Sequence, residues 1–360
     1  MFPLTQEQEL LLLLSSIDPD REKLARLLAR DVDWETLYSL ADQHRVLPQC
    51  FEAFSLLPES VVPSLELAKF RKRASDVAKS NLARAGQLIK LLDIFQGERI
   101  DIIVYKGLPL ASSCYGDAAK RQFTDIDLLI RKADFPTVKK ILLELGARPA
   151  HEFNANEERA VLKHSYEFPF FYGETDTLIE VHWDFVESFF AFNLDSEEVW
   201  SRAKNIELYG KKVLTLGAED NLVVIAAHSA KHFWQRLGWV CDIDRLVRTA
   251  EIDWNLVASV AKASGALKMV RMALLISRRL LNTPVCESLE TFLNNSETEE
   301  TIALEIAGSY LFGPEPVDWK EMARVHMTMK DSIANKFSYV YRLLKVKAID
   351  KLFMPMGRPQ

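Results

Sequence analysis

Two aspartates, Asp125 and Asp127, stand one residue apart directly before an apolar run at residues 128–130. In a β-strand, alternate side chains share a face, so both carboxylates point the same way while Ile126 points into the core. Two like charges this close are costly unless a cation lies between them. Mg²⁺ takes carboxylate and phosphate oxygens as ligands. The spacing therefore predicts a divalent-cation site that also receives phosphate, although a pair of solvated strand-end aspartates has the same spacing.

A third carboxylate, Glu180, lies in a second predicted strand with two unlike faces. One face is purely apolar and consists of Ile179, Val181 and Trp183. Because that face belongs in the core, Glu180 is forced onto the opposite face, where an unpaired mid-strand charge is expensive. If the two strands are neighbours, Glu180 meets the aspartates, and three such carboxylates hold two divalent ions roughly 3.5–4 Å apart. His182 and Asp184 share the face of Glu180, either in support of the site or as a solvated strand end.

An aspartate pair of this kind is a weak signal by itself. With 51 acidic residues in 360 positions, about seven acid-x-acid triplets arise by chance. The chain contains three further pairs, Asp18/Asp20, Asp31/Asp33 and Asp242/Asp244. The first two lie in helix-capping or loop contexts, which account for them without chemistry. The prediction of a site therefore depends on the strand context and on Glu180.

Several motifs surround these acids in a fixed order. A strand ends in Lys106-Gly107, a helix follows, and then come Tyr-Gly-Asp, an arginine, Asp-Ile-Asp-Leu-Leu and, later, Glu-Val-His-Trp. Together they resemble the DNA polymerase β-type nucleotidyltransferase superfamily, and more narrowly its bacterial branch of uncharacterised nucleotidyltransferases. The stretch HSAKHFWQRLGWVCDIDRL, followed by EIDW, is similar to that branch as well. The resemblance runs from about residue 30 to about residue 290.

The resemblance implies an α+β fold, in which a small mixed β-sheet carries metal ions at its strand ends and helical regions flank it on both sides. It also implies transfer of a nucleoside monophosphate from an NTP to an acceptor, with release of pyrophosphate. Asp125 and Asp127 match the metal-binding pair of the superfamily. Glu180 matches the third carboxylate, which helps to hold the acceptor-side metal. Two Mg²⁺ ions are the implied cofactors, and Mn²⁺ is expected to be able to substitute for them.

The phosphate-binding residues depart from the superfamily pattern. Its members usually carry Gly-Ser about ten residues before the acid pair, whereas here Lys106-Gly107 takes that place, with Gly107 18 residues before Asp125. Gly107 lets the backbone approach phosphate, the N-terminus of the following helix favours an anion, and Lys106 adds a point charge. The narrower branch shares this variant. Arg121 has two open roles, which are reaching the triphosphate and neutralising Asp125.

Two histidines four residues apart, His228 and His232, lie on a predicted helix. The spacing suits zinc, but no glutamate follows His228 and the sequence offers no third ligand. We therefore expect His228 to be a core or interface histidine. Lys231 and His232 are expected to face the cleft and to contact the phosphate or the base.

The predicted elements divide the chain into three regions. Residues 1–95 carry apolar residues at helical spacing throughout, and residues 217–360 return to that pattern. Residues 96–216 contain β-branched runs, short helices and hairpin turns, which together predict the α/β nucleotidyltransferase core. The predicted hairpin turns are Gly173–Asp176 and Gly210–Lys211.

Composition narrows the functional classes. A formal net charge of −6 disfavours a nucleic acid as partner. The cysteines Cys50, Cys114, Cys241 and Cys286 are far apart and lack CxxC spacing, as expected for free thiols in a reducing compartment. The leucine run at residues 10–14 is much shorter than the roughly 20 residues of a membrane span. We expect a soluble, cytoplasmic protein without membrane contact.

Two functions of different classes remain open. The first is a Mg²⁺-dependent nucleotidyltransferase that acts on a small molecule, a peptide or a protein. The second is a catalytically inactive nucleotide-binding or interaction module with the same fold, which the Lys-Gly variant and the long helical regions favour. The sequence identifies neither the acceptor nor the base of the NTP.

Overall fold

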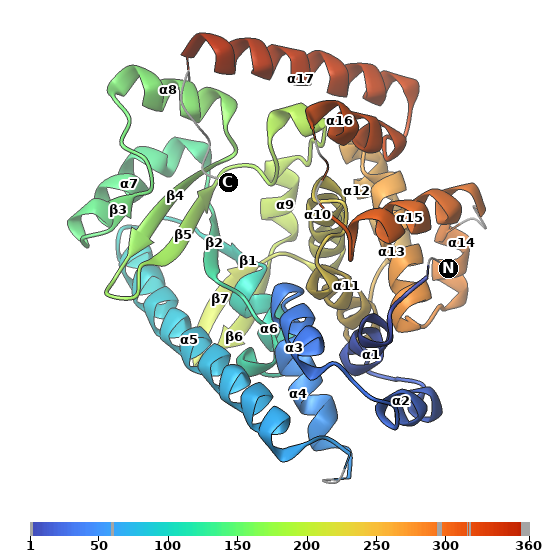
Figure 1. The fold of residues 1–360 in the computed structure, drawn as a ribbon. Coiled ribbons are helices and arrows are strands. Elements are labelled where there is room, and N and C mark those ends of the chain that lie inside the picture. The colour runs from blue at the N-terminus through green and yellow to red at the C-terminus, as the bar shows by residue number, and fades with distance from the viewer. Residues whose placement is uncertain (1–2, 59–60, 294–296, 315, 317, 354–360) are drawn as a thin grey trace.

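The computed structural model describes residues 3–58, 61–293, 297–314, 316 and 318–353, and its architecture is α+β (Figure 1). The N-terminal region is helical, as its apolar spacing predicts. Its helices are α1 (Gln6–Ser15), α2 (Arg21–Leu28), α3 (Trp34–Gln43), α4 (Leu47–Ser55) and the long α5 (Ser64–Gly97). The side chains of Asp20 and Asp33 accept backbone N–H groups at the starts of α2 and α3. Two of the aspartate pairs thus contain a helix cap.

The central sheet is small and mixed, as expected. Its strands are β1 (Ile103–Tyr105), β2 (Asp125–Leu129), β3 (Arg148–Pro149), β4 (Glu167–Tyr172) and β5 (Thr177–His182). They lie in the order β1-β2-β5-β4-β3. β2 and β5 are parallel, and the other neighbouring strands are antiparallel. The parallel pair places the beginnings of both strands at the same edge of the sheet.

Short elements connect these strands. They are α6 (Gly107–Tyr115), the 3₁₀ turns η1 (Ala118–Lys120) and η2 (Lys132–Asp134), α7 (Phe135–Glu144) and α8 (Ala155–His164). The turn between β4 and β5 is Gly173–Asp176, as predicted. A separate hairpin follows, formed by β6 (Lys204–Leu208) and β7 (Lys211–Thr215). Its turn residues are Tyr209 and Gly210, one position earlier than predicted, because both take the positive φ that a tight hairpin turn requires.

The two faces of the sheet have different environments. On one face, Ile126, Ile179 and Val181 are buried in a core that includes residues of α5 and α7. The opposite face carries Tyr105 and Leu129, which belong to a second buried core. Because side chains alternate along a strand, residues between the buried apolar ones of β2 and β5 are directed away from α5 and α7.

The C-terminal region is helical from Ala218 onward, as predicted. A 3₁₀ turn, η3 (Ser188–Phe190), and α9 (Ser196–Arg202) precede it. Its helices are α10 (Ala218–Lys231), α11 (Leu237–Thr249), α12 (Trp254–Ser264), α13 (Leu267–Leu281), α14 (Glu287–Leu293), α15 (Glu297–Tyr310), α16 (Trp319–Thr328) and α17 (Ile333–Phe353). Figure 1 shows α10 to α15 gathered beside the N-terminal helices and away from α5.

The two helical regions share one hydrophobic core. Leu10 and Leu14 of α1 belong to the same buried cluster as Met269 and Ala273 of α13. A backbone contact adds to this packing, since the N–H of Gly238 donates to the carbonyl of His44 at 3.0 Å. A Cβ atom on Gly238 would lie 3.0 Å from that carbonyl oxygen, so glycine permits the close approach. The N-terminal helices are thereby fixed against the start of α11.

The cysteines are unpaired, as expected. Cys50, Cys114, Cys241 and Cys286 are all free thiols, and the first three are buried. Within the described part of the chain, no helix combines the length and the apolarity needed to cross a bilayer.

Candidate active site

Parallel pairing of β2 with β5 brings the predicted acids together. The register pairs Asp127 with Glu180 and Asp125 with Leu178. Asp127 and Glu180 point away from α5 and α7, because Ile126 and the apolar residues of β5 fill the core on that side. The strand adjacency that a shared acidic site requires is present.

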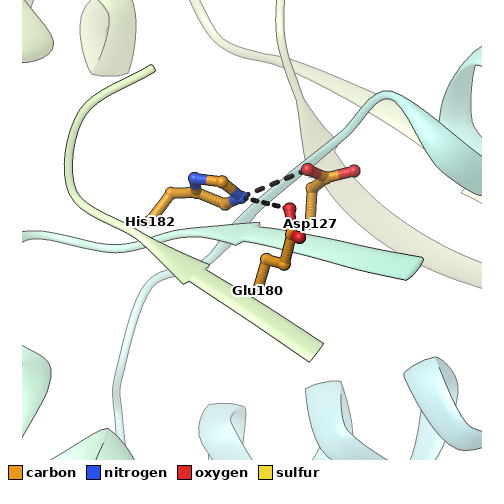
Figure 2. Close-up of side chains that lie close together, drawn as sticks. All are labelled: Asp127, Glu180 and His182. Carbon is orange, nitrogen blue, oxygen red and sulfur yellow. Dashed lines mark hydrogen bonds and ion pairs between the residues drawn. The ribbon is translucent and has the colours of Figure 1, made fainter. Parts of the chain in front are cut away.

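His182 lies between these carboxylates and is only 1% exposed. Its Nε2 is 3.1 Å from Asp127 Oδ1 and 3.4 Å from Glu180 Oε2 (Figure 2). Burial alone lowers the pKa of a histidine, but the hydrogen bonds to Asp127 and Glu180 outweigh it and raise the pKa of His182 to about 9. The neighbouring acids therefore favour the protonated form of His182 at neutral pH. The alternative in which His182 lies at a solvated strand end is therefore wrong.

Glu167 is a fourth acid that the sequence analysis missed. It lies on β4, and its Oε2 is 3.3 Å from His182 Nδ1. Burial raises the pKa of Glu167. A signal existed, because counting outward from the Gly173–Asp176 turn pairs Glu167 with His182 in the antiparallel register. His182 therefore contacts a carboxylate on each side of its ring.

Lys106 supplies the other positive charge in the cluster. Its Nζ is 3.0 Å from Asp127 Oδ1, and its side chain is 16% exposed. Burial disfavours the charged form, but Asp127 and Glu180 outweigh it and raise the pKa of Lys106. Its φ of +52° lies in a region that residues other than glycine rarely adopt. The structure thus places the Lys106 ammonium on an acid, whereas the sequence predicts a phosphate contact.

Asp125 and Asp127 differ in their ionisation. Burial and the charges of Asp127 and Glu180 raise the pKa of Asp125 to about 6. Burial also acts to raise the pKa of Asp127, but Lys106 and His182 outweigh it and lower that pKa to about 2. Asp125 therefore takes up a proton at a higher pH than Asp127 does, as expected for carboxylates that share a site.

The residues present fit a bound divalent cation. Asp127 Oδ2 is buried and has no hydrogen-bond partner among the residues that the structure describes. Within that part of the chain, Asp127, Glu180 and His182 form a group whose potential ligand atoms all lie within 4.8 Å of one another. A buried carboxylate oxygen without a partner is costly, and a cation would satisfy it.

Glu180 and His182, together with Asp125, line a cleft with a volume of about 570 Å³. Residues from all three regions line it, among them Gln43 and Arg45, Lys106, Gly107, Asp125 and Glu180, and Lys231, His232 and Trp239. The sequence analysis did not predict Arg45 as a cleft residue, because helical spacing gives no sign of a contact with a strand far along the chain. Its Nη1 donates to Thr124 Oγ1 at 3.2 Å, beside Asp125. The N-terminal region thereby contributes a positive charge to the cleft.

The helical wall of the cleft contains the other predicted residues. The rings of His228 and His232 lie 4.9 Å apart, and both contact the Trp239 ring. Burial lowers the pKa of both histidines well below the ordinary value, so they are neutral. Lys231 Nζ forms an ion pair with Glu187 at 2.6 Å. Lys231 and His232 line the cleft as expected, and so does His228.

Arg121 lines the cleft but does not neutralise Asp125. Its Nε and Nη2 donate to the two carboxylate oxygens of Asp242 at 2.7 and 2.8 Å. Tyr115 donates to the same carboxylate at 2.7 Å. The expectation that Arg121 neutralises Asp125 is therefore wrong, because the guanidinium is paired with Asp242 of α11.

Comparison with known proteins identifies the class. The profile of the family described as uncharacterised nucleotidyltransferase matches residues 30–282. This chain belongs to that family. Among curated proteins, none matches it.

Two solved structures align loosely with the chain. One is the crystal structure of the lincosamide antibiotic adenylyltransferase LnuA bound to lincomycin, with 13% identity, coverage of 46% of this chain and 97% of that chain, and a TM-score of 0.33. The other is the solution structure of the antibiotic-resistance factor ANT(2'')-Ia, with 14% identity, coverage of 55% and 93%, and a TM-score of 0.34.

Proposed function

We propose that the cleft transfers a nucleoside monophosphate from an NTP to an acceptor oxygen and releases pyrophosphate. The acceptor is a small molecule, a peptide or a protein. One observation carries the proposal, which is the pairing of buried Asp127 with Glu180, a residue that lines the cleft. One Asp127 oxygen has no hydrogen-bond partner among the described residues and could bind a cation. Family membership supports the same class of reaction.

Asp125, Asp127 and Glu180 are the residues proposed to hold divalent ions, which the sequence analysis expects to be two Mg²⁺ with Mn²⁺ as a substitute. Bound at these carboxylates, the ions would neutralise the charge that develops on the phosphate oxygens. The carboxylates also orient the acceptor and the nucleotide with respect to each other.

The triphosphate is proposed to lie against the start of α6. Gly107 is the first residue of this helix, whose N-terminal N–H groups and dipole attract anions. Arg45 and Lys106 line the cleft and add positive charge. Arg121, Lys231 and His232 also line it, and they would contact the nucleotide or the acceptor.

The chemical step breaks one bond and forms one. The acceptor oxygen attacks the α-phosphorus, and the bond between that phosphorus and the bridging oxygen of pyrophosphate breaks in line with the attack. Glu180, at the cleft surface, is proposed to take the proton of the acceptor hydroxyl. Pyrophosphate leaves with the electron pair of the broken bond.

A binding module without turnover is the second candidate. The contact between the Lys106 ammonium and Asp127 favours it, since a protein cation there competes with a metal ion. The two candidates differ in one outcome. An enzyme releases pyrophosphate, whereas a binding module retains the NTP unchanged.

Transfer of radiolabel tests the proposal. Purified protein is incubated with each of the four NTPs labelled at the α-phosphate, with Mg²⁺ or Mn²⁺ and a cell extract. We expect label to appear on an acceptor together with pyrophosphate. Asp127→Asn should abolish both, while Asp18→Asn should leave them unchanged. Asp18 is the matched control, because it belongs to another aspartate pair and is exposed.

Two outcomes would contradict the proposal. One is the absence of labelled product and pyrophosphate with every NTP and both metals. The other is NTP binding without pyrophosphate release that Asp127→Asn leaves unchanged, which would establish the binding module instead.

A further inference from the structure

We infer that the cation site at the end of β5 is a mixed site, in which the His182 imidazole is a ligand together with Asp127 and Glu180. Such a site selects a divalent transition-metal ion over Mg²⁺. The role of the bound ion in catalysis rests on the proposed function. It replaces an expected set of three carboxylates with two carboxylates and one nitrogen donor.

The grouping of side chains is the first support. In the described part of the chain, the group able to share one ion consists of Asp127, Glu180 and His182, and Asp125 does not belong to it. Glu180 and His182 are two residues apart on β5, so they share a face, and Asp127 is the register partner of Glu180 on β2. All three side chains converge on one point, as Figure 2 shows.

The orientation of the imidazole is the second support. Nε2 points inward, 3.1 and 3.4 Å from the Asp127 and Glu180 carboxylates, and Nδ1 points outward, 3.3 Å from Glu167. Histidine ligands of metal ions almost always place their second nitrogen against a carboxylate, a carbonyl or water, which fixes the ring and its tautomer. Glu167 lies on that side of the ring, at ion-pair distance from Nδ1 and outside hydrogen-bond geometry.

The packing around the ring is the third support. The Tyr105 and Tyr166 rings lie 5.4 and 5.8 Å from the His182 ring, which holds it in this orientation. Asp127 is 2% exposed, and its Oδ2 is unpartnered among the described residues. The site thus combines a fixed nitrogen donor with a buried oxygen that lacks a partner, open to the cleft on the side of Glu180.

The donor set determines which ions fit. Mg²⁺ takes oxygen ligands almost without exception and loses its water reluctantly. Imidazole suits transition-metal ions, which bind mixed nitrogen and oxygen sites more tightly than Mg²⁺ does. Three protein ligands with an open position also match the arrangement of catalytic metal sites. A nitrogen-accepting ion is therefore the expected occupant.

Binding of Mn²⁺ alone tests the inference, with no nucleotide present. We expect Mn²⁺ to bind more tightly than Mg²⁺, as measured by competition against the EPR signal of free Mn²⁺. Pulsed EPR should show coupling of the bound ion to ¹⁴N. His182→Gln should abolish that coupling and weaken Mn²⁺ binding about 10- to 100-fold, while changing Mg²⁺ binding less than about threefold.

Two further variants make the result specific. His228→Gln removes another cleft histidine that is outside the group, and it should change neither the coupling nor the affinity. Glu167→Gln keeps the ligand but removes the carboxylate behind it, so Mn²⁺ binding should weaken about tenfold while the ¹⁴N coupling remains. This second variant keeps the test decisive if His182→Gln does not fold.

The outcomes separate this inference from the transfer reaction. Bound Mn²⁺ without ¹⁴N coupling, or equal affinities for Mn²⁺ and Mg²⁺, would overturn the mixed site and leave nucleotidyl transfer standing. A nitrogen-coupled ion in a protein that releases no pyrophosphate would support the mixed site and refute the transfer.

Discussion

The tripeptide Asp-Ile-Asp occurs twice in this chain, at Asp125–Asp127 in β2 and at Asp242–Asp244 in α11. In the strand, the two aspartates share a face and meet a third acid, Glu180. In the helix, residues two apart point in different directions. Asp242 therefore binds Arg121, while Asp244 binds Arg248 and Thr283.

The comparison shows what distinguishes a site from a structural pair. Both oxygens of Asp242 accept hydrogen bonds from Arg121, so its charge is neutralised within the fold. Asp127 shares one oxygen between Lys106 and His182, and its other oxygen is buried without a partner among the described residues. An identical tripeptide thus has an aspartate with both oxygens paired in one element, and an aspartate with an oxygen that lacks a partner among the described residues in the other.

Asp127→Asn should produce the largest functional change. We expect nucleotidyl transfer to fall on the order of 10³-fold, because the ion loses a charged ligand. The unfolding free energy should change by only about 1 kcal/mol, since relief of repulsion from Asp125 and Glu180 offsets the lost contacts. Rates of label transfer and urea unfolding measure the two effects. A variant that unfolds but keeps its activity per folded molecule would contradict this assignment.

Asp242→Asn should show the opposite pattern. Removing one partner of a buried ion pair leaves Arg121 uncompensated, and we expect the unfolding free energy to fall by about 3 kcal/mol. Transfer per folded molecule should fall less than about tenfold. Urea unfolding and the transfer assay on the folded fraction measure this. If this variant instead lost activity as completely as Asp127→Asn while staying fully stable, the contrast between the two pairs would be wrong.

Thr283→Val should have a smaller effect at the helical pair. The Thr283 hydroxyl donates to Asp244 Oδ1 at 2.7 Å in a buried position. Its loss should lower the unfolding free energy by about 1–2 kcal/mol, while Arg248 continues to neutralise the aspartate. Transfer activity should be unchanged. A measurable fall in nucleotide affinity would show that the helical pair also serves the cleft.

Lys330 is a buried lysine whose surroundings predict a pH dependence of stability. Its ammonium donates to the Phe190 carbonyl and lies 3.7 Å from the centre of the Phe190 ring. In the part of the chain that the structure describes, no carboxylate forms an ion pair with it. Burial lowers the pKa of Lys330 from 10.5 to about 7.

The sign of that dependence follows from the lowered pKa. Below pH 7, Lys330 is charged in the folded and unfolded states, so the cost of its burial is fully present. Between pH 7 and 10.5 the unfolded state binds more protons, and the stability contribution of this group rises with pH. We expect Lys330→Met to be about 1 kcal/mol more stable than the natural sequence at pH 6 and to lose this advantage by pH 10. A difference that does not vary with pH would contradict the assignment.

Local patterns predicted much of the fold. The apolar spacing of the helices, the hairpin turn at Gly173–Asp176 and the split faces of β2 and β5 all follow from periods that the sequence displays. The same periods place Asp127 and Glu180 on the faces of their strands that lie opposite the apolar core. They do not determine that β2 and β5 are neighbours, because pairing depends on which apolar faces pack together in the complete fold.

Contacts between distant segments explain what was missed. Arg45 reaches the cleft because the turn after α3 packs on Gly238, and helical spacing carries no sign of such a contact. Arg121 binds Asp242 of α11, which is 121 positions away in the sequence, and local spacing gives no sign of such a contact. His182 is buried partly because β5 pairs with β4. The antiparallel register of these strands follows from counting outward from the Gly173–Asp176 turn, so this contact was predictable.

The most direct test of the account is a crystal structure of the protein soaked with Mn²⁺ and a non-hydrolysable NTP, with the ion located by anomalous scattering. We predict an anomalous peak bound by Asp127 and Glu180, with the phosphates against the start of α6 and the Lys106 ammonium moved from Asp127 toward them. A nucleotide bound elsewhere, or Lys106 still on Asp127 with no ion at the strand ends, would contradict the account.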